Sequence, residues 1–402
     1  LEYRTQVSLK KGERLPLPDM SNHTIGLAEA LEKCRTAIGY DEFRLSDNQK
    51  SNFRNKQGIG TAICSYGSSC YPHSTELSSA RVMVADASSA TLFIGSTEIG
   101  QDSDTTMAMI AAETLGIPLD KILVVRGDTD VCPIDMGAYA SRQTYVTGSA
   151  VKKAAKKCKD QILEKASTLY NQPLHKLDAC NGNIILRDSG KIIAPMSDVT
   201  LKIIYDLMEP QTICYEESYF PTDNVLTFGV TMAIVNVNID TGKVNVNKLV
   251  TCLDSGTIIN PLAAYGQLYG GSIMSLGYGL SEQIVIDPKT GRILNDNMLD
   301  YKIPTFLDVP EMEGYFVETE EPTSAYGNKV LGEPPNLTPA AAIRNAVYDA
   351  IGVCIHENPL TPERVYFALH KNFKNTQNSH IRNTYVVDND VEKQKENLNV
   401  LR

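Results

Sequence analysis

The chain has 402 residues, of which 42% are hydrophobic and 21% are charged, so it is long enough to form two or more packed units of an ordinary globular protein. Its formal net charge is −10, from 38 Lys and Arg against 48 Asp and Glu, which argues against nucleic acid as a partner. No apolar run approaches the ~18 residues that a membrane span needs, and the chain does not open with a signal-type segment. We therefore expect a cytoplasmic protein without a membrane partner.

An N-terminal segment and linker are expected over residues 1–57, because a single helix pattern at residues 25–37 is followed by a polar connector at 46–56. The main domain is expected over residues 58–370. In chain order its first predicted elements are a strand (60–66), a hairpin (81–84 and 91–94), a helix (105–115), a strand (122–125) and a long helix (149–170).

The second half of the main domain begins with a predicted hairpin at residues 228–239 and 244–252. A glycine-rich helix then begins at Asn260-Pro261, and close approach of another backbone or of a ligand is the usual reason for such glycines. Two more helices are predicted, one with Thr338 as its cap, Pro339 in its first turn and Gly352 at its end, and one from Pro362 to about residue 370. A polar tail is expected over residues 371–402.

Nine cysteines and six histidines are scattered along the chain, and no two cysteines form a Cys-x-x-Cys pair. Iron–sulfur and structural zinc sites usually show closely spaced cysteines, so neither is expected on this chain. An odd cysteine count without an export signal indicates reduced thiols. We therefore expect no side chain of this chain to bind a metal directly.

Two polar segments that precede helices have the composition of a ligand site. The turn at residues 95–101, Gly-Ser-Thr-Glu-Ile-Gly-Gln, frees backbone N–H groups near a helix start, which suits a phosphate or an electron-rich heterocycle. The segment at 137–144, Gly-Ala-Tyr-Ala-Ser-Arg-Gln-Thr, combines small residues with amide and hydroxyl groups that can orient a flat ligand. The alternatives are an ordinary turn and a polar loop at a helix start.

Glu333 is the candidate general base. It precedes Pro334 and Pro335, which restrict its backbone, and an apolar helix follows. A base must lie within hydrogen-bond reach of the proton that it takes, and a stiff loop beside a helix can hold it there. The alternative is a surface loop that ends at a helix cap.

The order of these segments resembles the molybdenum hydroxylase (xanthine dehydrogenase/aldehyde oxidase) family, and most closely the C-terminal half of the molybdenum-binding subunit of bacterial xanthine dehydrogenases. The resemblance runs from Gly58 to about residue 369. The segments that carry it are residues 95–101, 111–116, 137–148, 254–256, 259–262, 266–267, 299–305 and 324–335.

This resemblance implies an α+β fold, the second molybdopterin-binding domain of the family, with mixed sheets packed with helices. It also implies that molybdenum is held by the dithiolene sulfurs of a pterin, and that Glu333 is the base that takes a proton from the hydroxo ligand. Cys70 or Tyr71 would lie near the substrate. By position, the cofactor-binding residues would be Gly100, Gln101, Ala140, Ser141, Arg142, Gln143, Thr144 and Gln267, with Gly100 and Arg142 acting through their backbone.

Full-length members of the family have another half, whose motifs are not found in this chain. The resemblance therefore implies a second chain or segment that completes the molybdenum site, together with 2Fe-2S and FAD subunits in a dimer of heteromers. The implied cofactor is molybdenum-molybdopterin, in the cytosine dinucleotide form. The expected substrate is a purine such as xanthine or hypoxanthine; the alternatives are nicotinate or another N-heterocycle, and a non-catalytic assembly subunit.

Overall fold

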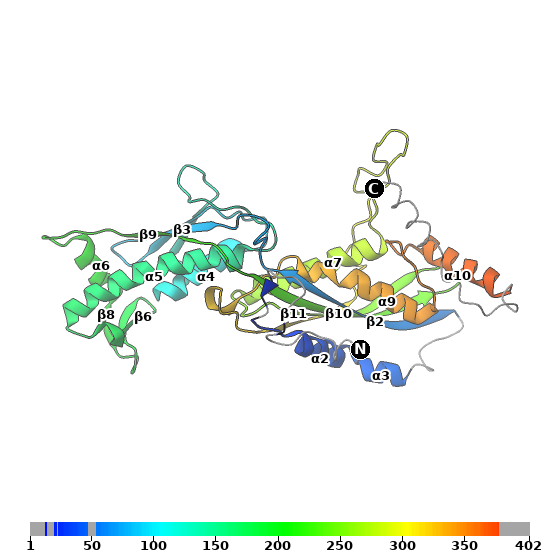
Figure 1. Cartoon of the computed structure of the whole chain (residues 1–402), viewed down its shortest axis with the longest axis horizontal. Coiled ribbons are helices and arrows are strands. Elements are labelled where there is room, and N and C mark those ends of the chain that lie inside the picture. The colour runs from blue at the N-terminus through cyan, green and yellow to red at the C-terminus, as the bar shows by residue number, and fades with distance from the viewer. Residues whose placement is uncertain (1–12, 14–19, 22, 47–53, 378–402) are drawn as a thin grey trace, which may run out of the picture.

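The chain forms two lobes that lie side by side along its longest axis (Figure 1). The computed structural model describes residues 13, 20–21, 23–46 and 54–377. The first lobe is built from residues 78–219, and the second combines the described residues up to 67 with the strands and helices after residue 223. Among the described residues, no helix is long and apolar enough to cross a membrane.

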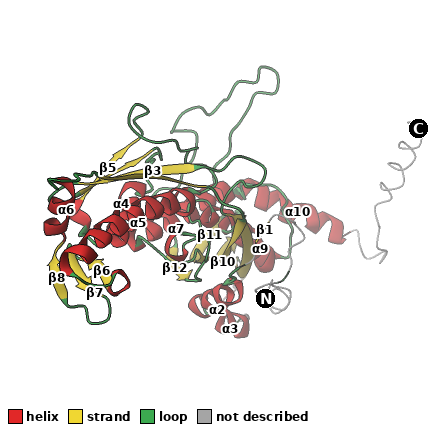
Figure 2. Ribbon diagram, turned by 60° about the vertical axis from the view of Figure 1, so that its left-hand side comes forward, coloured by secondary structure: helices red, strands yellow, loops and turns green. Residues whose placement is uncertain are grey.

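The first lobe is a layered structure in which two helices are covered by sheets on both sides (Figure 2). Its four-stranded sheet has the order β5-β4-β3-β9, and a three-stranded sheet, β6-β7-β8, lies across α5 with α6. The elements are β3 (Ser78–Val84), β4 (Ala90–Ile94), α4 (Ser103–Leu115), β5 (Ile122–Arg126), α5 (Gln143–Tyr170), β6 (Leu177–Cys180), β7 (Asn183–Leu186), β8 (Ile192–Pro195), α6 (Met196–Ile204) and β9 (Ile213–Tyr219).

The second lobe is a sheet with helices on both faces. β10 pairs antiparallel with β2 and β11, and β11 pairs parallel with β12. The strands are β1 (Met20–Ser21), β2 (Asn55–Gly67), β10 (Asn224–Asn238), β11 (Val244–Asp254) and β12 (Glu311–Val317). The helices are α2 (Leu27–Ile38), α3 (Tyr40–Leu45), α7 (Pro261–Leu280), α8 (Pro334–Leu337), α9 (Pro339–Ile351) and α10 (Pro362–Gln377).

Strand alternation explains why both faces of this sheet are covered. Successive side chains of a strand point to opposite faces. In β10 the even-numbered residues 226, 228, 230 and 232 pack against α2, whereas the odd-numbered residues 233, 235 and 237 pack in the core that contains α9. Both sets are apolar, so β10 is buried on both sides at the centre of the lobe.

Glycines allow the helices of this lobe to approach their neighbours closely. A Cβ atom on Gly60 of β2 would lie 2.2 Å from the carbonyl oxygen of Ala342 in α9. In the glycine-rich helix α7, a Cβ on Gly271 would lie 3.0 Å from Pro335, whereas a Cβ on Gly266 or Gly270 would meet no described residue within 4 Å. The expected close approach therefore exists along part of α7, and it brings that helix against the segment that carries Glu333.

The α+β class with mixed sheets is confirmed, and three details differ from the sequence prediction. Helix α5 begins at Gln143, six residues earlier than expected, and α10 continues to Gln377, past the expected start of the tail; residues 378–402 lie outside the described part. Thr338 does not cap α9 with its side chain. Its Oγ1 is instead 2.6 Å from Oγ1 of Thr231, because a buried hydroxyl needs a partner and β10 supplies one.

Candidate active site

A cavity of about 320 Å³ lies where the two lobes meet. The first lobe contributes the 95–101 turn, the start of α4 and residues 138–144, and the second contributes the start of α7 and residues 328–333. Six of the residues predicted for the site line it: Gln101, Ser141, Gln143, Thr144, Gln267 and Glu333. The four segments that the sequence singled out are therefore brought together at one cavity.

Glu333 stands immediately before α8, with its side chain exposed at this cavity. Its carboxylate oxygen Oε2 accepts hydrogen bonds from the hydroxyls of Ser141, at 2.7 Å, and of Tyr66. The Ser141 Oγ also accepts the backbone N–H of Glu333 at 2.8 Å. Ser141 lines the cavity, where its cofactor contact stays a prediction, and its hydroxyl both donates to and accepts from Glu333.

The loop that carries Ser141 has an unusual backbone. Ala140 and Ser141 both have left-handed φ values, 49° and 52°, which non-glycine residues rarely adopt. Such conformations persist only where the surroundings determine them, and here the next residue, Arg142, is anchored on the protein interior. The strained pair therefore lies between the cavity and a buried anchor.

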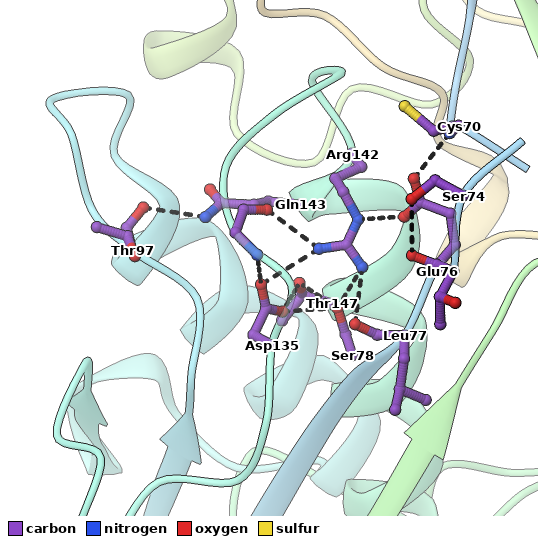
Figure 3. A network of polar contacts seen from close by, with 12 residues as sticks. Cys70, Ser74, Glu76, Leu77, Ser78, Thr97, Asp135, Arg142, Gln143 and Thr147 are labelled. Atoms are coloured by element: carbon purple, nitrogen blue, oxygen red, sulfur yellow. Dashed lines mark hydrogen bonds and ion pairs between the residues drawn. The ribbon is translucent and has the colours of Figure 1, made fainter.

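The buried anchor is a network centred on Arg142, whose side chain has no exposed area (Figure 3). Its guanidinium donates to Glu76 Oε2 at 2.5 Å and to Asp135 Oδ1 at 3.2 Å. Further hydrogen bonds go to the carbonyl oxygens of Gly137 and Leu77 and to the Ser78 hydroxyl. The Arg142 side chain is thus directed away from the cavity, and only its backbone remains a predicted cofactor contact.

The two glutamines join the 95–101 turn to the start of α5. Gln101 donates to the carbonyl oxygen of Thr97 at 3.0 Å and to Gln143 Oε1 at 2.6 Å, and Gln143 also donates to Thr97 at 3.0 Å. Gly100 has a φ of 100°, which only glycine adopts readily. Neither Gly100 nor Ala140 is among the residues that line the cavity. The two glutamines therefore fix the 95–101 turn beside the start of α5 at the cavity wall.

Unpaired polar groups at the cavity suit a flat, hydrogen-bonding cofactor. The Ser255 hydroxyl and Oδ1 of Asn328 are buried at this cavity and have no hydrogen-bond partner in the part of the chain that the structure describes. The side chains of Thr144 and Gln267 also line it and make no hydrogen bond within the described residues. Buried polar atoms normally have partners. Amide and hydroxyl groups of this kind fit the edges of a pterin ring, so the residues present are consistent with the expected group.

Cys70 and Tyr71, the predicted substrate residues, do not line the cavity. The Cys70 N–H donates to Glu76 Oε1 at 2.7 Å, so this loop is tied to the Arg142 network (Figure 3). Burial, and then the negative charge of Glu76, raise the pKa of the Cys70 thiol. The negative charge of Glu333 raises the same pKa to a smaller extent.

A buried ion pair that the sequence did not indicate lies at the cavity wall. Nζ of Lys329 is 3.0 Å from Oδ2 of Asp254, and both side chains are fully buried. The same carboxylate accepts the N–H of Gly26, just before α2, and the hydroxyl of Thr319. Burial lowers the pKa of Lys329, although the nearby Asp254 opposes this shift. The pair ties the N-terminal helix to the cavity, and nothing local in the sequence reveals it.

The chain belongs to the molybdopterin cofactor-binding domain family of the molybdenum hydroxylases. The family model described as "Molybdopterin cofactor-binding domain" matches residues 33–310. This confirms the family and the fold class that the motif order indicated. The family model begins inside the N-terminal segment, where α2 packs on β10 and β11.

Relatives and solved structures agree with this assignment. The xanthine dehydrogenase molybdenum-binding subunit of Escherichia coli O157:H7 is 39% identical over 373 residues, covering 92% of this chain and 49% of the relative. The nicotine 6-hydroxylase large subunit of Paenarthrobacter nicotinovorans is 29% identical and covers 71% of this chain and 36% of the relative. The structure of quinoline 2-oxidoreductase from Pseudomonas putida matches with a TM-score of 0.81 and 25% identity, over 89% of this chain and 48% of that one. The chain thus spans about half the length of the xanthine dehydrogenase subunit.

Proposed function

We propose that this chain is the C-terminal half of the molybdenum-binding subunit of a hydroxylase that oxidises a purine, such as xanthine or hypoxanthine, with water as the oxygen source. The observation that carries the proposal is the Glu333 carboxylate, held at the cavity by Ser141 and Tyr66 beside unpaired polar groups that suit a pterin. The identity of 39% to a xanthine dehydrogenase subunit supports the purine.

In the proposed reaction the bound cofactor supplies the two-electron oxidation and the activated oxygen. Thr144, Gln267 and Ser255 would hold its pterin through hydrogen bonds at the cavity wall. Glu333 would act as the general base. Its Oε2 already accepts two hydrogen bonds, whereas Oε1 accepts none within the described residues, so Oε1 is the atom that takes the proton.

We further propose that the site is completed by another polypeptide or segment, because Glu333 is exposed in this chain and the chain spans about half of its curated relative. Electrons would leave through 2Fe-2S and FAD subunits in a cytoplasmic dimer of heteromers, and the pterin would be the cytosine dinucleotide form. Elemental analysis of the natively purified assembly, with a gel of its polypeptides, tests this. Stoichiometric molybdenum with partner chains is expected; a metal-free chain that purifies alone contradicts it.

Replacement of Glu333 by Gln tests the base. The amide keeps the shape of the side chain but cannot accept the proton, so turnover of xanthine should fall by at least about a hundredfold, a typical general-base contribution. Molybdenum content should be unchanged, since Glu333 does not hold the pterin. The matched control is Glu363→Gln on the exposed face of α10, which should leave turnover unchanged. A Glu333→Gln assembly with near-normal turnover would remove Glu333 from the mechanism.

Nicotinate or another N-heterocycle is the second candidate substrate, because the nicotine 6-hydroxylase large subunit is among the relatives. Comparison of kcat/KM for xanthine, hypoxanthine and nicotinate in one preparation decides between them. A value for nicotinate at least tenfold above that for both purines would favour the second candidate. Molybdenum at full occupancy without turnover of any heterocycle would instead indicate the assembly subunit.

A further inference from the structure

The hydroxyl of Tyr66 contacts the proposed base from a distant part of the chain. Tyr66 lies on β2, 267 residues before Glu333, and its O–H donates to Oε2 of that carboxylate. The half-buried ring packs on a small cluster formed by Tyr145, Val146, Val225 and Val330. Packing on this cluster fixes the direction in which the phenol points.

The phenol of Tyr66 and the thiols of Cys64 and Cys70, which lie near Glu333, are neutral at neutral pH. Burial, and then the hydrogen bond to Glu333, raise the pKa of Tyr66 well above its ordinary value, so the phenol keeps its proton. Burial also raises the pKa of Cys64 to about 11, and the pKa of Cys70 is raised as well. The carboxylate is therefore the charged member of this group.

The cations near the cavity are each compensated by a carboxylate of their own. Lys329, from the segment that leads to Glu333, pairs with Asp254 at 3.0 Å. Arg142, behind the Ser141 loop, pairs with Glu76 and Asp135. The ionised form of Glu333 is thus stabilised at short range by two hydroxyl donors, Ser141 and Tyr66.

We propose that Tyr66 is a positioning residue that keeps the Glu333 carboxylate ionised and oriented for proton transfer, an inference that rests on the proposed role of Glu333 as the base. A hydrogen bond to a charged acceptor is stronger than one to its neutral form, so the donor favours the ionised carboxylate. Without the Tyr66 hydroxyl, Ser141 would still bond to the backbone N–H and to Oε2 of Glu333, but the charged carboxylate would have one hydrogen-bond donor fewer.

The variant Tyr66→Phe removes the donor and keeps the ring. In the native assembly, the acid limb of the pH profile of kcat/KM should move to higher pH by about one unit, the size that one hydrogen bond to a charged group gives. The plateau above the limb and the molybdenum content should change less than twofold. The matched control is Tyr219→Phe, because Tyr219 packs on the same cluster and donates to the carbonyl oxygen of Thr323 at 2.7 Å. Its acid limb should not move.

A second readout does not depend on turnover. Infrared difference spectra recorded against pH contain the carboxyl band of Glu333, which is identified by its loss in Glu333→Gln. In Tyr66→Phe the midpoint of this band should rise by about one pH unit, as the acid limb does. An unchanged midpoint in Tyr66→Phe, or an equal rise in Tyr219→Phe, would overturn the role of Tyr66. A raised midpoint combined with full turnover of Glu333→Gln would support the contact while rejecting Glu333 as the base.

Discussion

Arg142 is the residue on which the shape of the active-site loop most depends. Its guanidinium lies between two fully buried carboxylates, Glu76 and Asp135, and also binds the carbonyl oxygen of Gly137 in the loop itself. One arginine with five donors in a planar fork can satisfy all of these acceptors, which a lysine cannot. The network therefore explains how Ala140 and Ser141 are kept in left-handed conformations beside Glu333.

Replacement of Arg142 by Met should lower the free energy of unfolding by about 3–5 kcal/mol, because two buried carboxylates lose their counter-charge. The measurement is denaturant unfolding of the purified protein at neutral pH. The control is Arg35→Met, whose exposed pair with Asp41 should contribute less than about 1 kcal/mol. Equal losses in the two variants would mean that the network does not stabilise the fold.

Sequence reasoning located the residues with local signals and missed those that depend on distant partners. Glu333 between a glycine and two prolines, and the amide- and hydroxyl-rich loop before α5, are visible in the sequence. Tyr66 has no such signal, since its partner is 267 residues away. The buried ion pairs of the Arg142 side chain have no local signal either, because a polar residue in a polar loop does not show that its partners lie inside the protein.

At the scale of elements, α9 covers and closes the free edge of β2. Gly58 and Gly60 let the helix backbone approach the strand, and two polar side chains of α9 satisfy β2 backbone groups: Asp349 accepts the N–H of Ile59 at 2.9 Å, and Asn345 donates to the carbonyl oxygen of Thr61 at 2.9 Å. Edge strands expose unpaired backbone groups, to which strands of other molecules can pair. In this protein the side chains of α9 pair with some of these groups on β2.

Gly60→Ala should destabilise the protein by about 1–3 kcal/mol, since its Cβ would overlap the backbone of α9. Gly270→Ala on α7 is the matched comparison, because its Cβ would meet nothing within 4 Å. Alanine is the better helix former, so that change should be neutral or stabilising by up to roughly 1 kcal/mol. Both are read as thermal unfolding midpoints; a Gly60→Ala midpoint equal to the wild-type value would show that α9 can shift without cost.

Some of these helices and strands can be predicted from sequence patterns, and others cannot. The β3–β4 and β10–β11 hairpins and the helices α2, α4 and α9 have clear apolar periodicity and clear end signals, and they were predicted close to their observed bounds, whereas α3, α6 and α8 were not predicted. The strands β6, β7 and β8 have four residues each, too few for a periodic signal. β12 is held by parallel pairing with β11, and such non-local contacts have no local signature.

At the scale of the whole molecule, the segment between α7 and β12 exposes an apolar surface. Phe306 and Leu307 are 98% and 99% exposed, and Met298 and Leu299 are each 77% exposed. Apolar patches of this kind usually mark contact surfaces. Since the chain spans about half of its curated relative, we expect the polypeptide that supplies the other half to cover this segment.

Hydrogen–deuterium exchange tests this coverage. Peptides that span residues 298–307 should exchange at least tenfold more slowly in the native assembly than in the chain alone, because burial against a partner protects backbone amides. Peptides around Leu207 and Met208, a similarly exposed apolar pair in the loop after α6, are the internal comparison and should not change. Equal exchange of residues 298–307 in both preparations would exclude the contact.

The strand β2 has a consequence for how the proposed enzyme could adapt. One end of the strand is fixed under α9 at Gly58 and Gly60, and the other end carries Tyr66, while Glu333 is joined to the start of α9 through the short helix α8. The separation of phenol and carboxylate is therefore set partly by a helix–strand contact outside the cavity. Substitutions along α9 would therefore shift the pH range over which the proposed enzyme is active, without a change in any residue that lines the cavity.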